Sequence, residues 1–67
     1  MITQGTKAAL LREGDEIFTT EGRMTISNVK MVIVENIITY TATMNKCGTT
    51  SKRWADMDSI FNKVIDG

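Results

Sequence analysis

Alternation of hydrophobic and polar residues predicts a β-strand at residues 37–44. Side chains on a strand point alternately to its two faces. One face would carry Ile38, Tyr40, Ala42 and Met44 and pack in a core. The opposite face is rich in threonine, a good strand former, and we expect this face to meet water.

A second strand precedes it, and its hydrophobic pattern changes phase. The apolar positions of residues 24–34 move from Met24 and Ile26 to Val29, Met31 and Ile33. A one-residue slip in a two-residue period is typical of a β-bulge or a sharp bend, and we place it at Ser27-Asn28. Glu35-Asn36 then separates the two strands, a spacing that predicts a two-residue hairpin turn.

Two further strands are bounded by turn residues. Residues 16–20 form a β-rich run between Gly14 and Gly22. Residues 45–48 contain asparagine and glycine and predict a turn, after which residues 49–54 return as a short edge strand.

Helical structure is expected at both ends of the chain. Thr6 is positioned to cap a helical turn at residues 7–12 that directs Leu10 and Leu11 toward the core. A second helix would start at Asp56 or Asp58, run to about Ile65 and end at Gly67. Its apolar stripe, at three- and four-residue spacings, consists of Met57, Ile60, Phe61, Val64 and Ile65.

These elements predict one domain over residues 1–67, mainly β (α+β) in class. We expect a small bent antiparallel sheet or barrel of four to five strands, with a short N-terminal helical turn and a C-terminal helix. A chain of 67 residues buries only a small core. Cys47 is its one cysteine and histidine is absent, so neither an internal disulfide nor the commonest metal ligand is available. Self-association is therefore expected to support the fold.

Composition also limits the chemistry. Eight basic and eight acidic residues cancel, so the chain has no broad positive field to attract phosphate backbones. Without histidine, serine and threonine lack their usual base, and Cys47 is expected to be an inert thiol. We therefore expect no catalysis, metal or cofactor. The sequence shows neither a signal-peptide pattern nor a membrane-length apolar run, which predicts a cytoplasmic protein without a membrane segment.

Residues 11–22, followed by Ile26 and Val29, resemble the opening of small SH3-like barrels of the KOW type. In that family a Gly-Asp turn, here Gly14-Asp15, leads into the first strand, and a second glycine, here Gly22, forms the next turn. The resemblance implies a small barrel over about the first half of the chain. For KOW modules it also implies binding of RNA or of the transcription machinery.

The densest candidate site surrounds the one tryptophan. Three cations, Lys46, Lys52 and Arg53, lie on the turn and edge strand beside Trp54. An arginine and an indole can stack on a base while lysines meet phosphates. The indole can equally anchor an interface. Nearby hydroxyl groups could form a polar groove or an edge for a partner's strand; they belong to Thr39, Thr41, Thr43, Thr49 and Ser51. For an inhibitor or adaptor the expected contacts are Trp54, Arg53, Tyr40 and the last helix.

Three functional hypotheses follow. The first is a non-catalytic inhibitor or adaptor that binds a host protein or sequesters a small ligand, as an oligomer. In size and in its lack of proline and histidine, the chain is similar to small proteins of bacteriophages and mobile elements that inhibit or sequester host factors. The second is a nucleic-acid module using Arg23, Lys30, Lys46, Lys52 and Arg53.

The third hypothesis is a structural subunit of a larger assembly. In each case the predicted C-terminal helix has two alternative uses. It covers an open end of the barrel, or it pairs with a second copy of the chain through Ile60, Phe61 and Val64.

Overall fold

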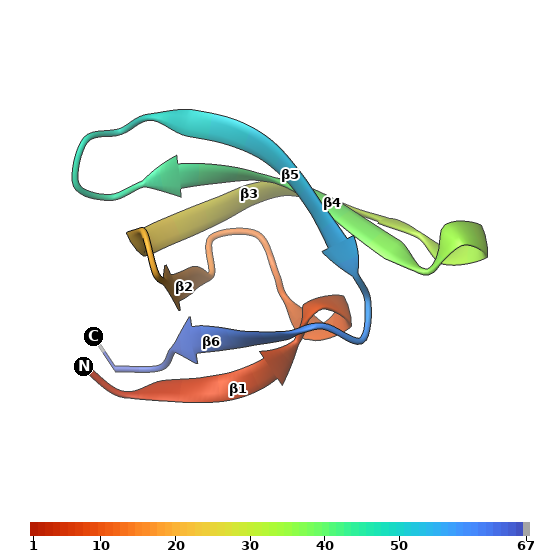
Figure 1. The fold of residues 1–67 in the computed structure, drawn as a ribbon, viewed down its shortest axis with the longest axis horizontal. Helices are drawn as coiled ribbons and strands as arrows, with labels where there is room; N and C mark the ends of the chain where they lie inside the picture. The colour runs from red at the N-terminus through yellow and green to blue at the C-terminus, as the bar shows by residue number, and fades with distance from the viewer. Residues whose placement is uncertain (67) are drawn as a thin grey trace.

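The computed structural model describes residues 1–66 and contains one six-stranded antiparallel sheet (Figure 1). Its strand order is β1-β6-β2-β3-β4-β5, which leaves β1 and β5 at the edges. The strands are β1 (Thr3–Lys7), β2 (Glu16–Thr19), β3 (Gly22–Val32), β4 (Ile37–Met44), β5 (Thr50–Asp56) and β6 (Ile60–Val64). Short 3-10 turns occupy Ala8–Leu10 and Ile33–Glu35. The expected mainly β class is confirmed.

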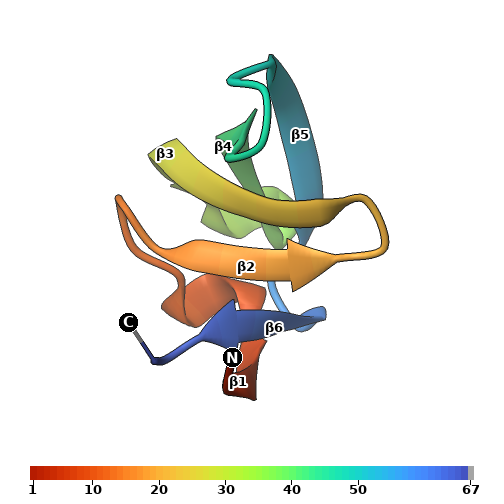
Figure 2. The ribbon, with the colours of Figure 1, turned by 90° about the vertical axis from the view of Figure 1, so that its left-hand side faces the viewer.

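The sheet is strongly bent, so that β5 runs across the direction of β2 and β6 (Figure 2). This shape is compatible with a small β-barrel. The core lies inside the bend and consists of Leu11, Ile17, Met24, Ile26, Tyr40 and Ala42, with Val29, Met44 and Phe61 partly buried against them. Tyr40 on β4 meets Phe61 on β6 edge-to-face, with ring centroids 6.0 Å apart. This contact joins the two halves of the sheet across its interior.

The predicted bulge in β3 is confirmed. Ser27 lies opposite Thr41 and Lys30 opposite Thr39, so Asn28 and the residue after it face Tyr40 alone. Asn28 adopts a left-handed conformation with φ of 52°, which asparagine tolerates better than most residues. Its backbone N–H donates to Oε1 of Glu13 at 2.9 Å. The extra residue places Met31 opposite Ile38, on the side of the sheet where Ile26 lies opposite Ala42, although Met31 itself is 46% exposed.

The turn between β3 and β4 is longer than the predicted two-residue turn. Val32 pairs with Ile37, so four residues form the loop. Asn36 is left-handed, with φ of 56°, and its N–H donates to the carbonyl oxygen of Ile33 at 3.1 Å. This bond closes a 3-10 turn before the chain reverses. As a result the predicted strand residues Ile33 and Val34 leave the sheet and are 80% and 98% exposed.

The predicted C-terminal helix is wrong. Residues 60–64 form β6, which lies between β1 and β2 and pairs with both. The apolar stripe contains β-branched and aromatic residues that favour strands, and two partner strands outweigh a short helix that is marginal by itself. Of the predicted interface residues, Phe61 packs on the core, Ile60 is exposed and Val64 pairs with Thr3. The predicted helix end, Gly67, lies outside the described residues.

The N-terminal segment also differs from the prediction. Thr6 belongs to β1, which the sequence pattern did not indicate, and the following 3-10 turn has no side-chain cap. Leu11 is buried as expected, but Leu10 is 58% exposed, and Ala8, the first residue of the turn, is buried. A 3-10 turn rotates successive side chains by about 120°, so two adjacent leucines do not both face inward. Neither helical turn in residues 1–66 is long or apolar enough to cross a membrane.

Candidate functional site

The predicted cluster around Trp54 is divided between the two faces of β5. Trp54 lies opposite Thr39 and Lys52 opposite Thr41, so these side chains share the outer face of the sheet. Arg53 lies opposite Tyr40, whose ring is in the core. Residues adjacent on a strand point to opposite faces. The arginine and the indole therefore do not form one stacking platform.

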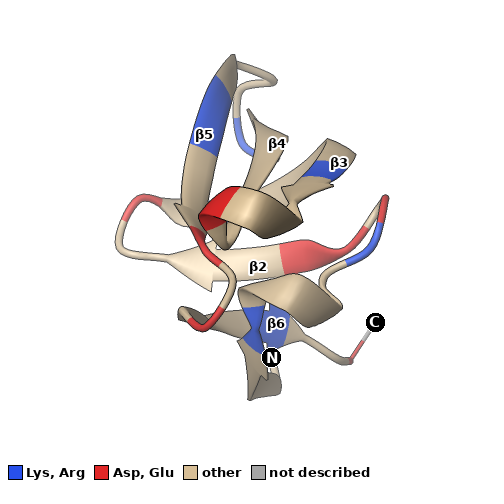
Figure 3. Ribbon diagram, turned by 90° about the vertical axis from the view of Figure 1, so that its right-hand side faces the viewer, with Lys and Arg blue, Asp and Glu red and all other residues tan. Residues whose placement is uncertain are grey.

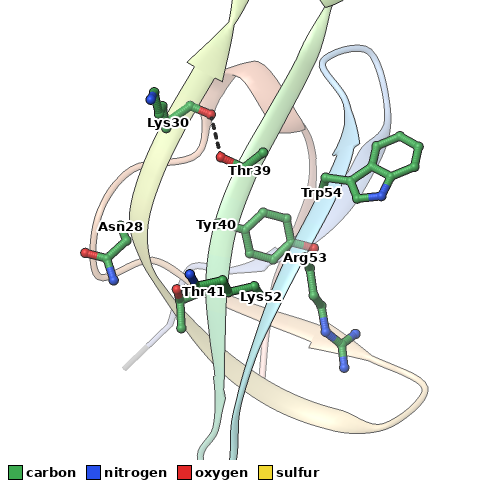
Figure 4. Close-up of a pocket in the computed structure, with 8 residues that line it drawn as sticks. All are labelled: Asn28, Lys30, Thr39, Tyr40, Thr41, Lys52, Arg53 and Trp54. Carbon is green, nitrogen blue, oxygen red and sulfur yellow. Dashed lines mark hydrogen bonds between the residues drawn. The ribbon is translucent and has the colours of Figure 1, made fainter.

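The outer face of β3, β4 and β5 is hollowed by a shallow groove of about 460 Å³ (Figure 4). We call it the outer groove. Thr39 stands at its centre between Lys30 on β3 and Trp54 on β5. The Thr39 hydroxyl donates to the Lys30 carbonyl oxygen at 3.4 Å. The groove is lined by Asn28, Lys30, Thr39, Tyr40, Thr41, Lys52, Arg53 and Trp54.

The outer groove combines one exposed indole with two free ammonium groups. Trp54 is 68% exposed, which is unusual for the largest apolar side chain of a small domain. Lys30 and Lys52 form no ion pair with any carboxylate among residues 1–66. Thr39 and Thr41 add hydroxyls between them. The groove can therefore accept a ligand that is anionic at one part and apolar at another.

The arginines are engaged elsewhere. Arg53 Nη1 lies 3.0 Å from Oε2 of Glu21, and Arg53 Nε donates to the Ser51 hydroxyl at 3.0 Å. Arg23 pairs with Glu16 at 3.1 Å. Each guanidinium group is thus paired with a carboxylate of the fold. Two cations that the sequence offers for phosphate binding are thus unavailable to the outer groove unless the ion pairs open.

Tyr40 lies beside Arg53 on the inner side of the sheet. Burial raises the pKa of the Tyr40 phenol above its ordinary value of 10.0, and the nearby positive charge of Arg53 opposes part of that rise. Tyr40 is therefore a neutral core residue at physiological pH. Tyr40 and Arg53 contribute to the lining of the outer groove. Their side chains nevertheless point to the inner face of the sheet.

The predicted row of hydroxyl groups is only partly correct. Thr39, Thr41 and Thr43 share the outer face, as the alternation predicts. Ser51, however, lies opposite Ala42 on the inner side, and Thr49 precedes the first residue of β5. The neighbours of the threonine row on β5 are instead Thr50, Lys52 and Trp54. The register of β5 differs by one residue from the predicted one, so the residues expected on the outer face lie on the inner face and the reverse.

The turn before β5 contributes a separate exposed region. Lys46 is exposed on this turn and does not line the outer groove. Cys47 is exposed too, and its Sγ lies 3.2 Å from the Thr49 hydroxyl. Hydrogen bonds from the side chain and backbone of Thr49 hold the pKa of the Cys47 thiol below its ordinary value. The thiol is thus more acidic than an ordinary exposed cysteine.

The sequence did not identify Asn28 as a site residue, although the bulge places it on the groove wall. The phase slip that predicts the bulge was the signal that could have indicated this. Residues 1–66 contain no group of three or more Cys, Asp or Glu side chains arranged to hold a metal ion. The groove offers contacts for binding: an indole face, hydroxyl groups and ammonium groups.

Comparisons with protein-family models, with curated proteins and with solved structures give no match to this chain. The SH3-like, KOW-type resemblance therefore depends on the quoted residues of the first half alone. What the structure adds is the fold class: a small antiparallel β sheet compatible with a barrel.

Proposed function

We propose that this chain is a non-catalytic binding protein, an inhibitor or adaptor, that takes an acidic segment of a partner protein in the outer groove. The observation that carries the proposal is the exposed Trp54 beside two unpaired lysines, Lys30 and Lys52. Tryptophan is enriched among residues that dominate binding energy at interfaces. The lysines would meet the carboxylates of the segment, and the indole would cover its apolar part.

The distribution of charge favours a protein partner over nucleic acid. Affinity for a phosphate backbone comes mainly from neutralised phosphates, and the chain has a net charge of zero. Its outer groove has two lysines that pair with no carboxylate among residues 1–66, whereas Arg23 and Arg53 are paired with Glu16 and Glu21. The resulting field is local, suited to a few carboxylates in one peptide.

The test measures binding of a short fluorescent peptide that alternates glutamate with phenylalanine, by anisotropy at low salt. Trp54→Ala should weaken binding at least about 30-fold, since hot-spot residues contribute 2 kcal/mol or more. Lys52→Ala should weaken it about two- to five-fold, the usual effect of an exposed charge pair. Lys7→Ala is the matched control, because Lys7 is an exposed lysine on β1 at the other edge of the sheet. Equal affinity of the native chain and Trp54→Ala would refute the proposal.

Single-stranded nucleic acid is the second candidate, as the KOW-type resemblance implies. It is supported by the same indole, on which a base could stack, with Lys30 and Lys52 placed to meet phosphates. Two neutralised phosphates give a dependence of log affinity on log salt of only about −1.4. A fluorescent oligothymidylate in the same assay distinguishes the candidates. Tighter binding of the oligonucleotide than of the peptide, lost with Trp54→Ala, would favour the nucleic-acid function.

A further inference from the structure

On the free edge of β5, the backbone groups of alternate residues point away from β4, and the hydrogen bonds to β4 show which residues these are. At one end of the strand the Met44 N–H donates to the Thr49 oxygen at 2.8 Å, and past the other end the Met57 N–H donates to the Asn36 oxygen at 3.0 Å. The register between β4 and β5 is uninterrupted. Alternate residues of an antiparallel strand bond to the same neighbour. The groups that point away from β4 therefore belong to Thr50, Lys52, Trp54 and Asp56.

This edge lies along the side of the molecule. In Figure 3, β5 forms one margin of the upper half of the sheet, with Lys and Arg positions in blue on the strand. No other strand of residues 1–66 pairs with it on that side. Asp56 uses its carbonyl oxygen for the Ser59 N–H at 3.0 Å, which ends the accessible stretch there. An uncovered edge of this kind is a template for another strand.

The sequence of β5 favours pairing of its free edge with β5 of a second copy of the chain. A two-fold axis perpendicular to the sheet pairs residues that share a face. Three such registers join five or more residues of Thr50–Asp56, and they differ in the residue at the axis. An axis at Lys52 sets lysine against lysine, and an axis at Arg53 sets arginine against arginine. Like charges directly opposite each other destabilise a sheet.

The third register has its axis at Trp54 and is complementary throughout. Trp54 would lie opposite the partner's Trp54, and Lys52 opposite the partner's Asp56 on both sides of the axis. Arg53 would lie opposite the partner's Ala55. The outward backbone groups of Lys52 and Trp54 and the Asp56 N–H are in phase for this pairing, because residues of equal parity meet, while the Asp56 carbonyl oxygen stays bonded to Ser59. A lysine on an edge strand usually discourages pairing, but here each lysine meets an aspartate.

We propose that the chain forms a two-fold dimer through antiparallel pairing of β5 with β5 of a second copy, centred on Trp54. The two six-stranded sheets then become one continuous sheet. The two outer grooves join into a single surface with both indoles at its middle. The dimer requires no ligand, so it goes beyond the proposed function and is tested without it. It also gives a small chain without disulfides the support of a partner subunit.

The test is sedimentation of the full chain without ligand, from micromolar to millimolar concentration. The native chain should approach twice its monomer mass of 7.5 kDa. Lys52→Asp sets two carboxylates against each other at both ends of the pairing and should raise the dissociation constant at least tenfold. Asp56→Lys should do the same. Combining Lys52→Asp with Asp56→Lys exchanges the charges and should restore the native constant to within a few-fold.

Lys30→Asp is the matched control, because Lys30 lies on the same face but on β3, away from the free edge. It should leave the dissociation constant unchanged, and circular dichroism should report the same sheet content for every variant. A monomer at all concentrations would overturn the proposal. So would a dimer that Lys52→Asp does not weaken, or a charge-exchanged variant that remains dissociated.

Discussion

Asn28 offers the most direct test of how the sheet is bent. Its φ of 52° lies in the left-handed region, at the point where two residues of β3 face one residue of β4. The Asn28 N–H is held by Oε1 of Glu13 at 2.9 Å. The backbone therefore cannot relax to an extended conformation without losing this bond and the register beyond it.

The expected magnitudes follow from backbone conformation. Asn28→Ala places an ordinary L residue in the left-handed region and should lower the free energy of unfolding by about 1 kcal/mol. Asn28→Gly should change it by less than about 0.5 kcal/mol, because glycine enters this region freely but costs more entropy to order. At about 0.05–0.15 kcal/mol per residue, the whole chain is stable by about 3–10 kcal/mol. One alanine thus removes a tenth to a third of its stability.

Urea unfolding followed by circular dichroism and by Trp54 fluorescence measures these differences. In thermal melts of the same variants, the midpoint temperature of Asn28→Ala should fall by about 4–8 °C, as expected for a domain of this size. Ser27→Ala is the matched control, because Ser27 is the neighbouring β3 residue and does not have a positive φ. Equal stability of Asn28→Ala and the native chain would refute the assignment of the bend to this conformation, as would a glycine variant less stable than the alanine variant.

Three further predictions concern the thiol, the phenol and the core. Thr49→Val should raise the pKa of the Cys47 thiol by removing the hydroxyl bond, so the pH profile of iodoacetamide alkylation should move to higher pH. Folding raises the pKa of Tyr40, so the stability that the neutral phenol contributes is present below pH 10.0 and is lost as pH rises through the folded-state pKa. Tyr40→Phe should therefore reduce the fall of the urea midpoint at alkaline pH. Met24→Ala removes a fully buried side chain and should cost about 2–5 kcal/mol, measured by thermal melts.

Patterns that depend on local alternation were predictable from the sequence. The bounds of β4 and its inward face of Ile38, Tyr40 and Ala42 agree with the two-residue period. The slip in phase located the bulge beside Asn28 for the same reason, since a buried face fixes the register on either side. The separation of Arg53 from Trp54 also follows from strand alternation, which outweighs their proximity along the chain.

The remaining differences depend on contacts between distant segments. The apolar residues from Ile60 to Ile65 fit a helical stripe and a strand almost equally well. The choice is made by β1 and β2, which lie far away in the sequence and flank β6. No local pattern predicts a strand at Thr3–Lys7, because its hydrophobic and polar residues do not alternate. The segment becomes a strand by pairing with β6, which is far away in the sequence. Likewise the ion pair of Arg53 with Glu21 requires the folded sheet.

The position of β6 between β1 and β2 has a consequence for biosynthesis. Among residues 1–66, β1 pairs in the sheet with β6 alone, so it has no neighbouring strand until residues 60–64 have been synthesised. During translation β2 to β5 can form consecutive hairpins while β1 is still unpaired. Closure of the sheet thus couples two strands that are distant in the sequence, and it should occur only once β6 has emerged from the ribosome.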